Sequence, residues 1–461
     1  MNTLDPNLIS EFRSVLAGPV FTPDNDAYNA VRQLWNATAD KHPALIVQCW
    51  DRGDVIAALK FARQHQLEIA VRGAGHNIAG NASCDGGLMI DLSNMQGIEL
   101  DQAAERVYVQ PGVILEQLDA ATQAHGLAVP IGINSTTGIA GLTLGGGFGW
   151  LTRQYGMTVD SLVGVELITV DGEILYANEA ENDELFWALR GGGGNFGIVT
   201  RFDFSLVSVG PDVLAGLMVF PLAQADAVLK RYAEWILTTP LTFNAWVVLR
   251  AAPPLPFLDA SLHGTPVAVI PICHTGDLAS GEKLVDTLRS FGEPVGEHIG
   301  VMPFVDWQQA FDPMLTAGAR NYWKTHNFTQ LSPELLQLAV DFADQQPGPE
   351  CEVFFACIAG VSNEVAPEAM AWQARDAKFV MNIHARWQDI HDDGSHIDWA
   401  RALFNAAQPY ASAGAYVNFM TEEEGGRIES AYADNYQRLV AVKQAYDPDN
   451  LLHFNQNIKP D

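Results

Sequence analysis

The 461-residue sequence predicts an α+β fold of two domains, and two features along the chain indicate it. Strand-like and helix-like segments alternate over residues 1–206, whereas beyond about Gly210 glycine becomes rarer and longer helices appear. At roughly 150 residues per domain, the length suits two or three domains. We therefore expect mixed sheets in the first half and a separate domain in the middle of the chain.

In the first half, short apolar runs predict strands, and runs with one apolar face predict helices. The predicted helix after Asp51, for example, places Val55, Leu59 and Ala62 on one face. The predicted strands are 44–50, 68–72, 87–92, 106–110, two within 163–176, and 198–207; the predicted helices are 51–66, about 114–126, and 183–190.

In the second half, we predict helices at 222–237 and 333–344 and strands at 266–273, 351–359 and 380–387. The last strand alternates polar and apolar residues, which predicts one buried face. A similar alternation at 321–326 predicts a strand that carries Tyr322, Lys324 and His326 on one face.

Composition excludes several classes of protein. The 26 basic and 55 acidic residues give a net charge of −29, which repels nucleic acid and anionic membranes. No apolar run is long enough to cross a bilayer, and the N-terminus lacks a secretory signal. Five scattered cysteines without a CxxC motif favour the reducing cytoplasm. The acidic segment 390–398 has no metal-ligand spacing, so we expect a solvated loop there and no metal site.

Three glycine clusters carry the functional signal. They are VRGAGHNIAG (71–80), GIAGLTLGGGFG (138–149) and GGGGNFG (191–197). Gly192, Gly194 and Gly197 satisfy GxGxxG, but a helix precedes this loop and a strand follows it, which is the reverse of the dinucleotide-binding order. Each loop alone is equally typical of a tight turn. Together they predict a long ligand lying against exposed backbone.

At these clusters the sequence resembles the FAD-linked oxidases of the vanillyl-alcohol-oxidase type, and more narrowly their berberine-bridge-enzyme-like branch. Further matching segments are GGLMIDLSNM (86–95), LFWALRGGGGNFGIVTRFDF (185–204), AYVNF (415–419) and NYQRLVAVKQAYDPDNLLHFNQNI (435–458). The resemblance implies a PCMH-type FAD-binding domain at 1–206 with a C-terminal return at 415–461. It also implies a substrate domain at 207–414, built as an antiparallel sheet backed by helices.

The resemblance also implies the cofactor contacts. His76 is the position at which the family bonds FAD covalently, although a histidine in such a loop can also be an ordinary hydrogen-bonding residue. Other implied FAD contacts are Arg72, Gly73, Ala74, Gly75 and Asn77, then Thr137, Gly138, Gly141, Gly145, Gly146 and Gly147, then Asn195, Gly197 and Val199, and finally Asn455 and Asn457. Turn capping is the alternative role for the two C-terminal asparagines.

One departure from the family concerns a second covalent link. Many relatives attach the flavin through a cysteine as well, and that position falls on Asn134 here. Asparagine cannot form the thioether, and Cys84 lies in a different segment. We therefore expect FAD linked through one histidine only.

The resemblance places Tyr416 as the catalytic base over the reacting face of the flavin. A free tyrosine titrates near pH 10, so a nearby cation has to lower its pKa. Lys324 and His326 are the candidates. The alternatives are that Tyr416 is a core aromatic and Lys324 a surface charge. The catalytic acid of some relatives falls near 359–361, where this chain has none, and this favours Tyr416.

The sequence therefore predicts an FAD-dependent oxidoreductase that oxidises a hydroxyl or amine of a small molecule by hydride transfer. Small Thr143, near the expected oxygen route, favours reoxidation by molecular oxygen. Three alternatives remain: a dehydrogenase using another acceptor, an electron-transfer subunit, and an inert flavin-binding protein on the same fold.

Overall fold

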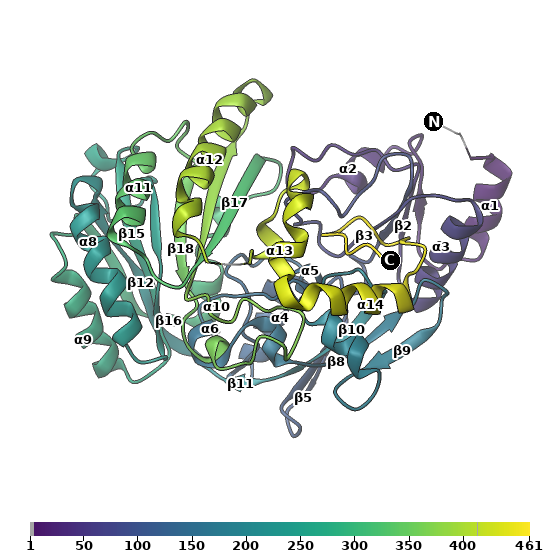
Figure 1. The fold of residues 1–461 in the computed structure, drawn as a ribbon, viewed down its shortest axis with the longest axis horizontal. Coiled ribbons are helices and arrows are strands. Elements are labelled where there is room, and N and C mark those ends of the chain that lie inside the picture. Colours follow the sequence, from purple (N-terminus) through teal and green to yellow (C-terminus); the bar gives the residue numbers. More distant parts are fainter. Residues whose placement is uncertain (1–3, 413) are drawn as a thin grey trace.

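The computed structural model describes residues 4–412 and 414–461 and confirms the α+β fold. Three small sheets occupy the first 208 residues, and one large sheet follows. Figure 1 shows the two parts side by side, with the large sheet and its helices at the left and the N-terminal sheets at the right.

The first sheet has the strand order β1-β2-β4-β3. Strand β4 runs parallel to both β2 and β3, and β1 is antiparallel to β2, so the sheet is mixed as predicted. Its strands are β1 (Val20–Phe21), β2 (Leu45–Gln48), β3 (Ile69–Arg72) and β4 (Leu88–Asp91).

The second sheet is antiparallel, with the order β5-β6-β10-β8-β9. Its strands are β5 (Ile98–Asp101), β6 (Arg106–Val109), β8 (Leu162–Ile168), β9 (Ile174–Ala177) and β10 (Ile198–Ser205). A third pair joins β7 (Leu127–Ala128) to β11 (Val207–Ser208), so N-terminal pairing extends to Ser208. The domain boundary at 206/207 stays a prediction.

Helices of the first half begin where the sequence supplies caps. Asp51 accepts a hydrogen bond from the Asp54 N–H at 3.1 Å and so starts α3 (Arg52–Gln64). The buried face of α3 includes Val55, Leu59 and Ala62, as predicted. The other helices are α1 (Pro6–Ser14), α2 (Tyr28–Arg32), α4 (Leu115–Gln123), α5 (Ile139–Leu144), α6 (Thr152–Tyr155) and α7 (Asp183–Leu189).

The large sheet is antiparallel throughout, with the order β16-β12-β15-β14-β18-β19-β17, and β13 also pairs with β15. Its strands are β12 (Asp212–Pro221), β13 (Phe243–Ala245), β14 (Val247–Ala251), β15 (Pro266–His274), β16 (Gly296–Pro303), β17 (Arg320–Phe328), β18 (Glu352–Cys357) and β19 (Phe379–Trp387).

Helices α8 (Leu222–Trp235), α9 (Leu278–Arg289), α11 (Pro333–Ala343) and α12 (Asp393–Ala407) back this sheet (Figure 1). The short α10 (Phe304–Gln308) contacts both strands β12 and β16 of this sheet and α4 of the first half. The helix-backed antiparallel sheet predicted for the middle of the chain is therefore confirmed.

Two local expectations are wrong, the second only in part. All nine residues of β19 are buried, although the alternation predicted a half-buried strand. Helix α12 covers one face of β19, and the other face lines a cavity roofed by the first half of the chain. The segment 390–398 is a short helical turn followed by the start of α12 rather than a loop; most of its residues are exposed, as expected, but His396 is buried.

The C-terminal segment returns to the first half. Helices α13 (Ile428–Tyr432) and α14 (Tyr436–Tyr446) share one hydrophobic core with residues of β6, β8, β10 and α7. A fully buried ion pair joins Lys443 to Asp447 at 2.6 Å. The same ammonium donates to the carbonyl of Asn195 at 2.9 Å and that of Leu452 at 3.1 Å. This lysine therefore connects the C-terminal return to the third glycine loop.

Within the described residues, no helix has the length and apolar character needed to span a membrane.

Replacing Lys443 by methionine tests this connection. Removing one partner leaves the buried Asp447 carboxylate without its cation, so we expect Lys443→Met to lower the free energy of unfolding by about 3–5 kcal/mol. Lys230→Met is the matched control, because Lys230 pairs with Asp226 in an exposed i,i+4 pair and its loss should cost below about 1 kcal/mol. Chemical denaturation followed by circular dichroism measures both, and equal costs would contradict the assigned role of Lys443.

Candidate active site

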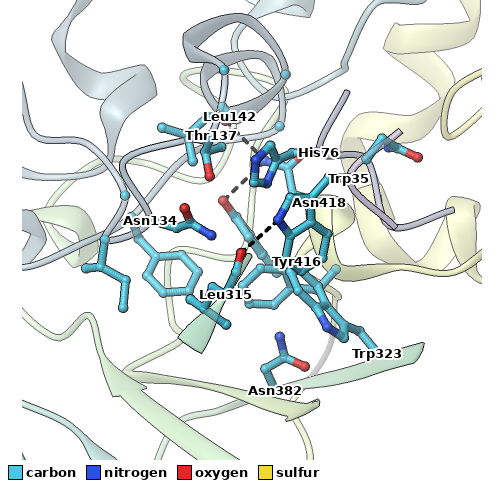
Figure 2. A pocket seen from close by; sticks show the side chains of 18 of the residues that line it. Trp35, His76, Asn134, Thr137, Leu142, Leu315, Trp323, Asn382, Tyr416 and Asn418 are labelled. Atoms are coloured by element: carbon cyan, nitrogen blue, oxygen red, sulfur yellow. Dashed lines mark hydrogen bonds between the residues drawn. The ribbon is translucent and has the colours of Figure 1, made fainter. Parts of the chain in front are cut away.

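A cavity of about 420 Å³ lies between the glycine loops of the first half and one face of the large sheet. This volume is within the range of small-molecule and cofactor sites in proteins. Figure 2 shows His76, Trp35 and Asn134 grouped with Tyr416 and Asn418 from the C-terminal return, while Trp323 and Asn382 come from the sheet.

The first-half wall has the features of a cofactor cradle. None of the backbone N–H groups of residues 73–77 donates to a backbone carbonyl of the described chain, so these donors are available to an anion. A Cβ atom on Gly141 or Gly194 would meet no protein atom within 4 Å, and both glycines line the cavity. The buried Oδ1 atom of Asn455 has no partner among the described residues and can accept from a ligand. These features fit an extended phosphate-bearing cofactor such as FAD.

The structure brings most of the predicted cofactor residues together. Those that line the cavity are His76, Gly73, Ala74, Gly75, Asn77, Thr137, Gly138, Gly141, Gly145, Gly197, Val199 and Asn455. Those that do not line it are Arg72, Gly146, Gly147, Asn195 and Asn457.

The residues that do not line the cavity shape its wall. The Arg72 guanidinium pairs with buried Asp91 and donates to the carbonyls of Val31 and Gln33. The Asn195 side chain donates to the Gly192 carbonyl and accepts from the Ile458 N–H, which ties the third loop to the C-terminus. Neighbouring protein groups already occupy the hydrogen-bonding atoms of these two side chains, so their role as FAD contacts stays a prediction.

His76 is held in one orientation and one protonation state. Its ring stacks on Trp35, with the centroids 5.0 Å apart. Thr136 Oγ1 lies 2.8 Å from Asn134 Oδ1, which can only accept, and 3.0 Å from His76 Nε2. The hydroxyl proton is therefore used on Asn134, and Nε2 must carry the hydrogen that Thr136 accepts. Burial lowers the pKa of His76 to about 4, so at neutral pH the ring is uncharged and Nδ1 holds a lone pair.

Asn134 lines the cavity beside His76 and supports this hydrogen-bond chain. Cys84 is buried and does not line the cavity, and burial raises the pKa of its thiol to about 12. No thiolate is therefore available at the place where a second flavin link would form.

Tyr416 lines the cavity and is buried. Its hydroxyl oxygen accepts from the Gly147 N–H at 3.1 Å and from Asn418 Nδ2 at 3.2 Å. Burial outweighs these two donors and raises the pKa of Tyr416 to about 12. The phenol is therefore protonated at neutral pH and has its own hydrogen free to donate.

The expectation that Lys324 and His326 provide the cation beside Tyr416 is wrong. Strand β17 does carry Tyr322, Lys324 and His326 on one face, but that face is turned away from the cavity and towards α12. The Lys324 ammonium lies 3.0 Å from Glu423 and 3.2 Å from Glu424. His326 stacks on Phe404 of α12, its Nε2 donates to the Phe404 carbonyl, and burial lowers its pKa to about 4. Trp323, on the opposite face of β17, lines the cavity instead.

The sheet wall of the cavity also carries polar residues that were not predicted from the sequence. Arg250, Glu352, Asn382 and His384 all line the cavity, so an acid is present there although none occurs at 359–361. Glu352 and Phe354 lie two residues apart on one face of β18, and this alternation was the available signal. Burial favours the neutral form of Glu352, but nearby Arg250, His384 and Arg386 together outweigh burial and hold the pKa of this carboxyl below its ordinary value.

Of the neighbouring residues Leu142 and Thr143, Leu142 lines the cavity. The Thr143 hydroxyl donates to the Ile139 carbonyl at 2.7 Å within α5, and this side chain does not line the cavity. The size of Thr143 is therefore not a guide to access from the cavity.

Comparison with known proteins agrees with this geometry. Residues 43–178 match the sequence profile described as "FAD binding domain", and residues 415–459 match the profile described as "Berberine and berberine like". These segments contain the first two glycine loops and the Tyr416-bearing return.

Similar proteins span nearly the whole chain. An FAD-linked oxidoreductase of Dictyostelium discoideum is 30% identical and aligns over 98% of this chain and 97% of its own. The (R)-6-hydroxynicotine oxidase of Paenarthrobacter nicotinovorans is 29% identical, with 97% of each chain covered. The crystal structure of 6-hydroxy-D-nicotine oxidase from Arthrobacter nicotinovorans superimposes with a TM-score of 0.85 at 26% identity, covering 97% of this chain and 98% of that one.

The position of Lys324 leads to a prediction about pH. Since this ammonium binds Glu423 and Glu424 on the far face of β17, Lys324→Met should lower stability without changing the charge around Tyr416. We expect the pH profile of flavin reduction in Lys324→Met to match that of the wild type across the neutral to mildly alkaline range. Tyr416→Phe, which removes the phenol hydroxyl, is the comparison. A profile displaced to higher pH in Lys324→Met would show that the ammonium does act on Tyr416.

Proposed function

This chain belongs to the berberine-bridge-enzyme-like family of FAD-linked oxidoreductases, and we propose that it oxidises a carbon bearing a hydroxyl or an amine in a small ring-containing molecule. The proposal rests on one observation: the glycine loops and an aromatic wall of the large sheet face each other across the same cavity. Bound FAD supplies the acceptor for the hydride that leaves this carbon. The 6-hydroxynicotine oxidases, similar along the whole chain, are named for a ring-bearing amine, which supports this substrate class.

The aromatic wall supports a ring-bearing substrate. Trp246 and Phe354 line the cavity with their planes 12° apart, and Phe148 and Phe419 pack edge-on against Tyr416. Such surfaces favour flat apolar groups over hydroxyl-rich ones, because a ring packs against an aromatic face and a hydroxyl finds no hydrogen-bond partner there.

We assign Tyr416 as a hydrogen-bond donor to the substrate rather than as the base. Its raised pKa leaves the phenol protonated, and no cation lowers that pKa within the described surroundings. A donor at this place can hold a substrate oxygen, whereas the lone pair of a reacting amine has to stay free to form the iminium ion. An uncharged amine then loses only the hydride and needs no protein base, and the aromatic cavity favours the uncharged form. An alcohol also gives up its hydroxyl proton, for which the ionised Glu352 carboxylate in the same cavity is an acceptor.

We further propose that FAD is attached through His76 alone. The neutral ring with a lone pair on Nδ1 is the nucleophilic state of histidine, and Trp35 and Thr136 fix its orientation. Asn134 supplies an amide where a second link would need a thiol.

We propose molecular oxygen as the final acceptor, which takes up two electrons and two protons and leaves as hydrogen peroxide. The 6-hydroxynicotine oxidases, which are similar over nearly the whole chain, support an oxidase.

We also propose that the protein works in the reducing cytoplasm, because its five cysteines are all free and buried. Fractionation of cells that express the untagged protein tests that location.

Flavin attachment is tested by denaturing the purified protein in acid. We expect the wild-type protein to keep its flavin in the precipitate and His76→Ala to release it. Thr136→Val keeps the shape but removes the acceptor for Nε2–H, so it should slow attachment while FAD still binds. Thr143→Val is the matched control, since Thr143 bonds only within α5. Complete release of flavin from the denatured wild-type protein would refute the covalent link.

The reaction is tested by anaerobic mixing with ring-bearing amines and alcohols, followed by admission of air. At least one compound should bleach the flavin absorbance, and air should restore it faster than it reoxidises free reduced flavin. Tyr416→Phe should slow the bleaching by roughly tenfold, the worth of one neutral hydrogen bond, if its hydroxyl holds the substrate. No bleaching with any such compound would favour an electron-transfer or inert flavoprotein. Bleaching followed by slow reoxidation would favour a dehydrogenase.

A further inference from the structure

A row of three polar side chains crosses the sheet wall of the cavity. Arg250 on β14 is the register partner of Glu352 on β18, which is in turn the partner of His384 on β19. All three line the cavity, and the neighbouring cross-strand row holds Val248, Phe354 and Asn382. The polar row therefore lies at a fixed place on an otherwise mostly apolar surface.

The hydrogen-bonding state of His384 follows from its neighbours. Asn321 Nδ2 donates to the Ala319 carbonyl at 2.8 Å, which identifies the other atom of this amide, Oδ1, as the acceptor facing His384. His384 Nε2 lies 2.9 Å from that oxygen and must donate to it. Burial lowers the pKa of His384, so the ring is neutral and its Nδ1 atom is a bare acceptor. This atom faces Glu352 Oε1 at 3.5 Å, so two acceptors stand side by side.

The donor of the row is Arg250. Its Nη1 atom donates to Glu352 Oε2 at 2.8 Å, and its Nε atom donates to the Ala251 carbonyl at 3.3 Å. These bonds leave Nη2 for a ligand in the cavity. The row thus offers hydrogen-bond donors next to a pair of acceptors, Glu352 and His384.

The formal charges of the row cancel. Arg250 is a cation, Glu352 is an anion, and His384 is neutral, so a ligand with a full charge of either sign meets a like charge. An uncharged group with a donor and an acceptor side by side would satisfy both ends of the row. Trp246, Phe354 and Trp323 border the row and suit a planar ring attached to such a group.

We propose that the Arg250–Glu352–His384 row is the subsite that selects the substrate, and that it binds an uncharged donor–acceptor edge on a planar ring, such as a carboxamide or a lactam. Its N–H donates to the Glu352 carboxylate and His384 Nδ1, and its carbonyl oxygen accepts from Arg250. This inference deepens the proposed function by naming the substrate class, but ligand binding can be tested without turnover.

Three probes with one ring and different head groups test the subsite: benzamide, benzoate and benzylamine, the last two charged at neutral pH. Binding to the purified flavoprotein is measured by calorimetry at fixed ionic strength. We expect benzamide to bind at least about tenfold more tightly than either charged probe. Equal affinities, or tighter binding of benzoate or benzylamine, would overturn the proposal.

Two variants should change the preference in opposite directions. Glu352→Gln removes the anion, so benzoate should gain on benzamide, whereas Arg250→Gln removes the cation, so benzylamine should gain. Glu297→Gln removes an acid from the exposed Arg289–Glu297 pair and should leave the order unchanged. The Gln variants are compared only where flavin content and melting temperature match the wild type; otherwise the wild-type order of the three probes decides.

These arms separate the two proposals. Preference for benzamide without flavin bleaching by any tested substrate leaves the subsite standing and refutes the oxidation. Bleaching by amines or alcohols, combined with no preference among the probes, supports the oxidation and refutes the subsite.

Discussion

The cavity depends on the way in which the C-terminal return is held against the first half of the chain. Lys443 is buried between Asp447 and the carbonyls of Asn195 and Leu452. One ammonium therefore links helix α14, the third glycine loop and the segment that follows α14. Asn195 adds a second link through the Ile458 N–H. Residues 416–419 and 455–456, which complete the cavity wall, lie on the segment that these buried contacts and the shared hydrophobic core hold in place.

Within that wall, burial decides the protonation states. His76 is uncharged and Tyr416 keeps its proton because each loses water without gaining a compensating charge, and His384 is uncharged because burial outweighs the neighbouring Glu352 carboxylate. Glu352 is the exception, since the neighbouring Arg250 keeps it ionised. The result is a mostly apolar site with one balanced ion pair. Such a site stabilises neutral ligands and makes each remaining hydrogen bond count for more than it would in water.

Strand β17 illustrates how a correct local prediction can lead to a wrong site. Its alternation was predicted correctly, and Tyr322, Lys324 and His326 do share a face. Which face meets the cavity is decided by α12, which packs on the Lys324 side and leaves Trp323 to the ligand. Glu352 shows the converse case. The sequence predicts no acid at the cavity because 359–361 holds none. Cross-strand pairing with Arg250 and His384 nevertheless places the Glu352 carboxylate there, earlier in the chain.

The sequence by itself determined the fold class, the order of the glycine loops and the position of His76 in the first of them, because these depend on local signals: short-range periodicity, glycine spacing and one family pattern. The tertiary structure alone decided which side chains share the cavity. Arg72 and Asn195 belong to the matched motifs, yet their hydrogen bonds are spent on Asp91 and Ile458. Arg250, Glu352 and His384 are separated by up to 134 positions and become neighbours only through strand register, which long-range pairing fixes and local sequence does not encode.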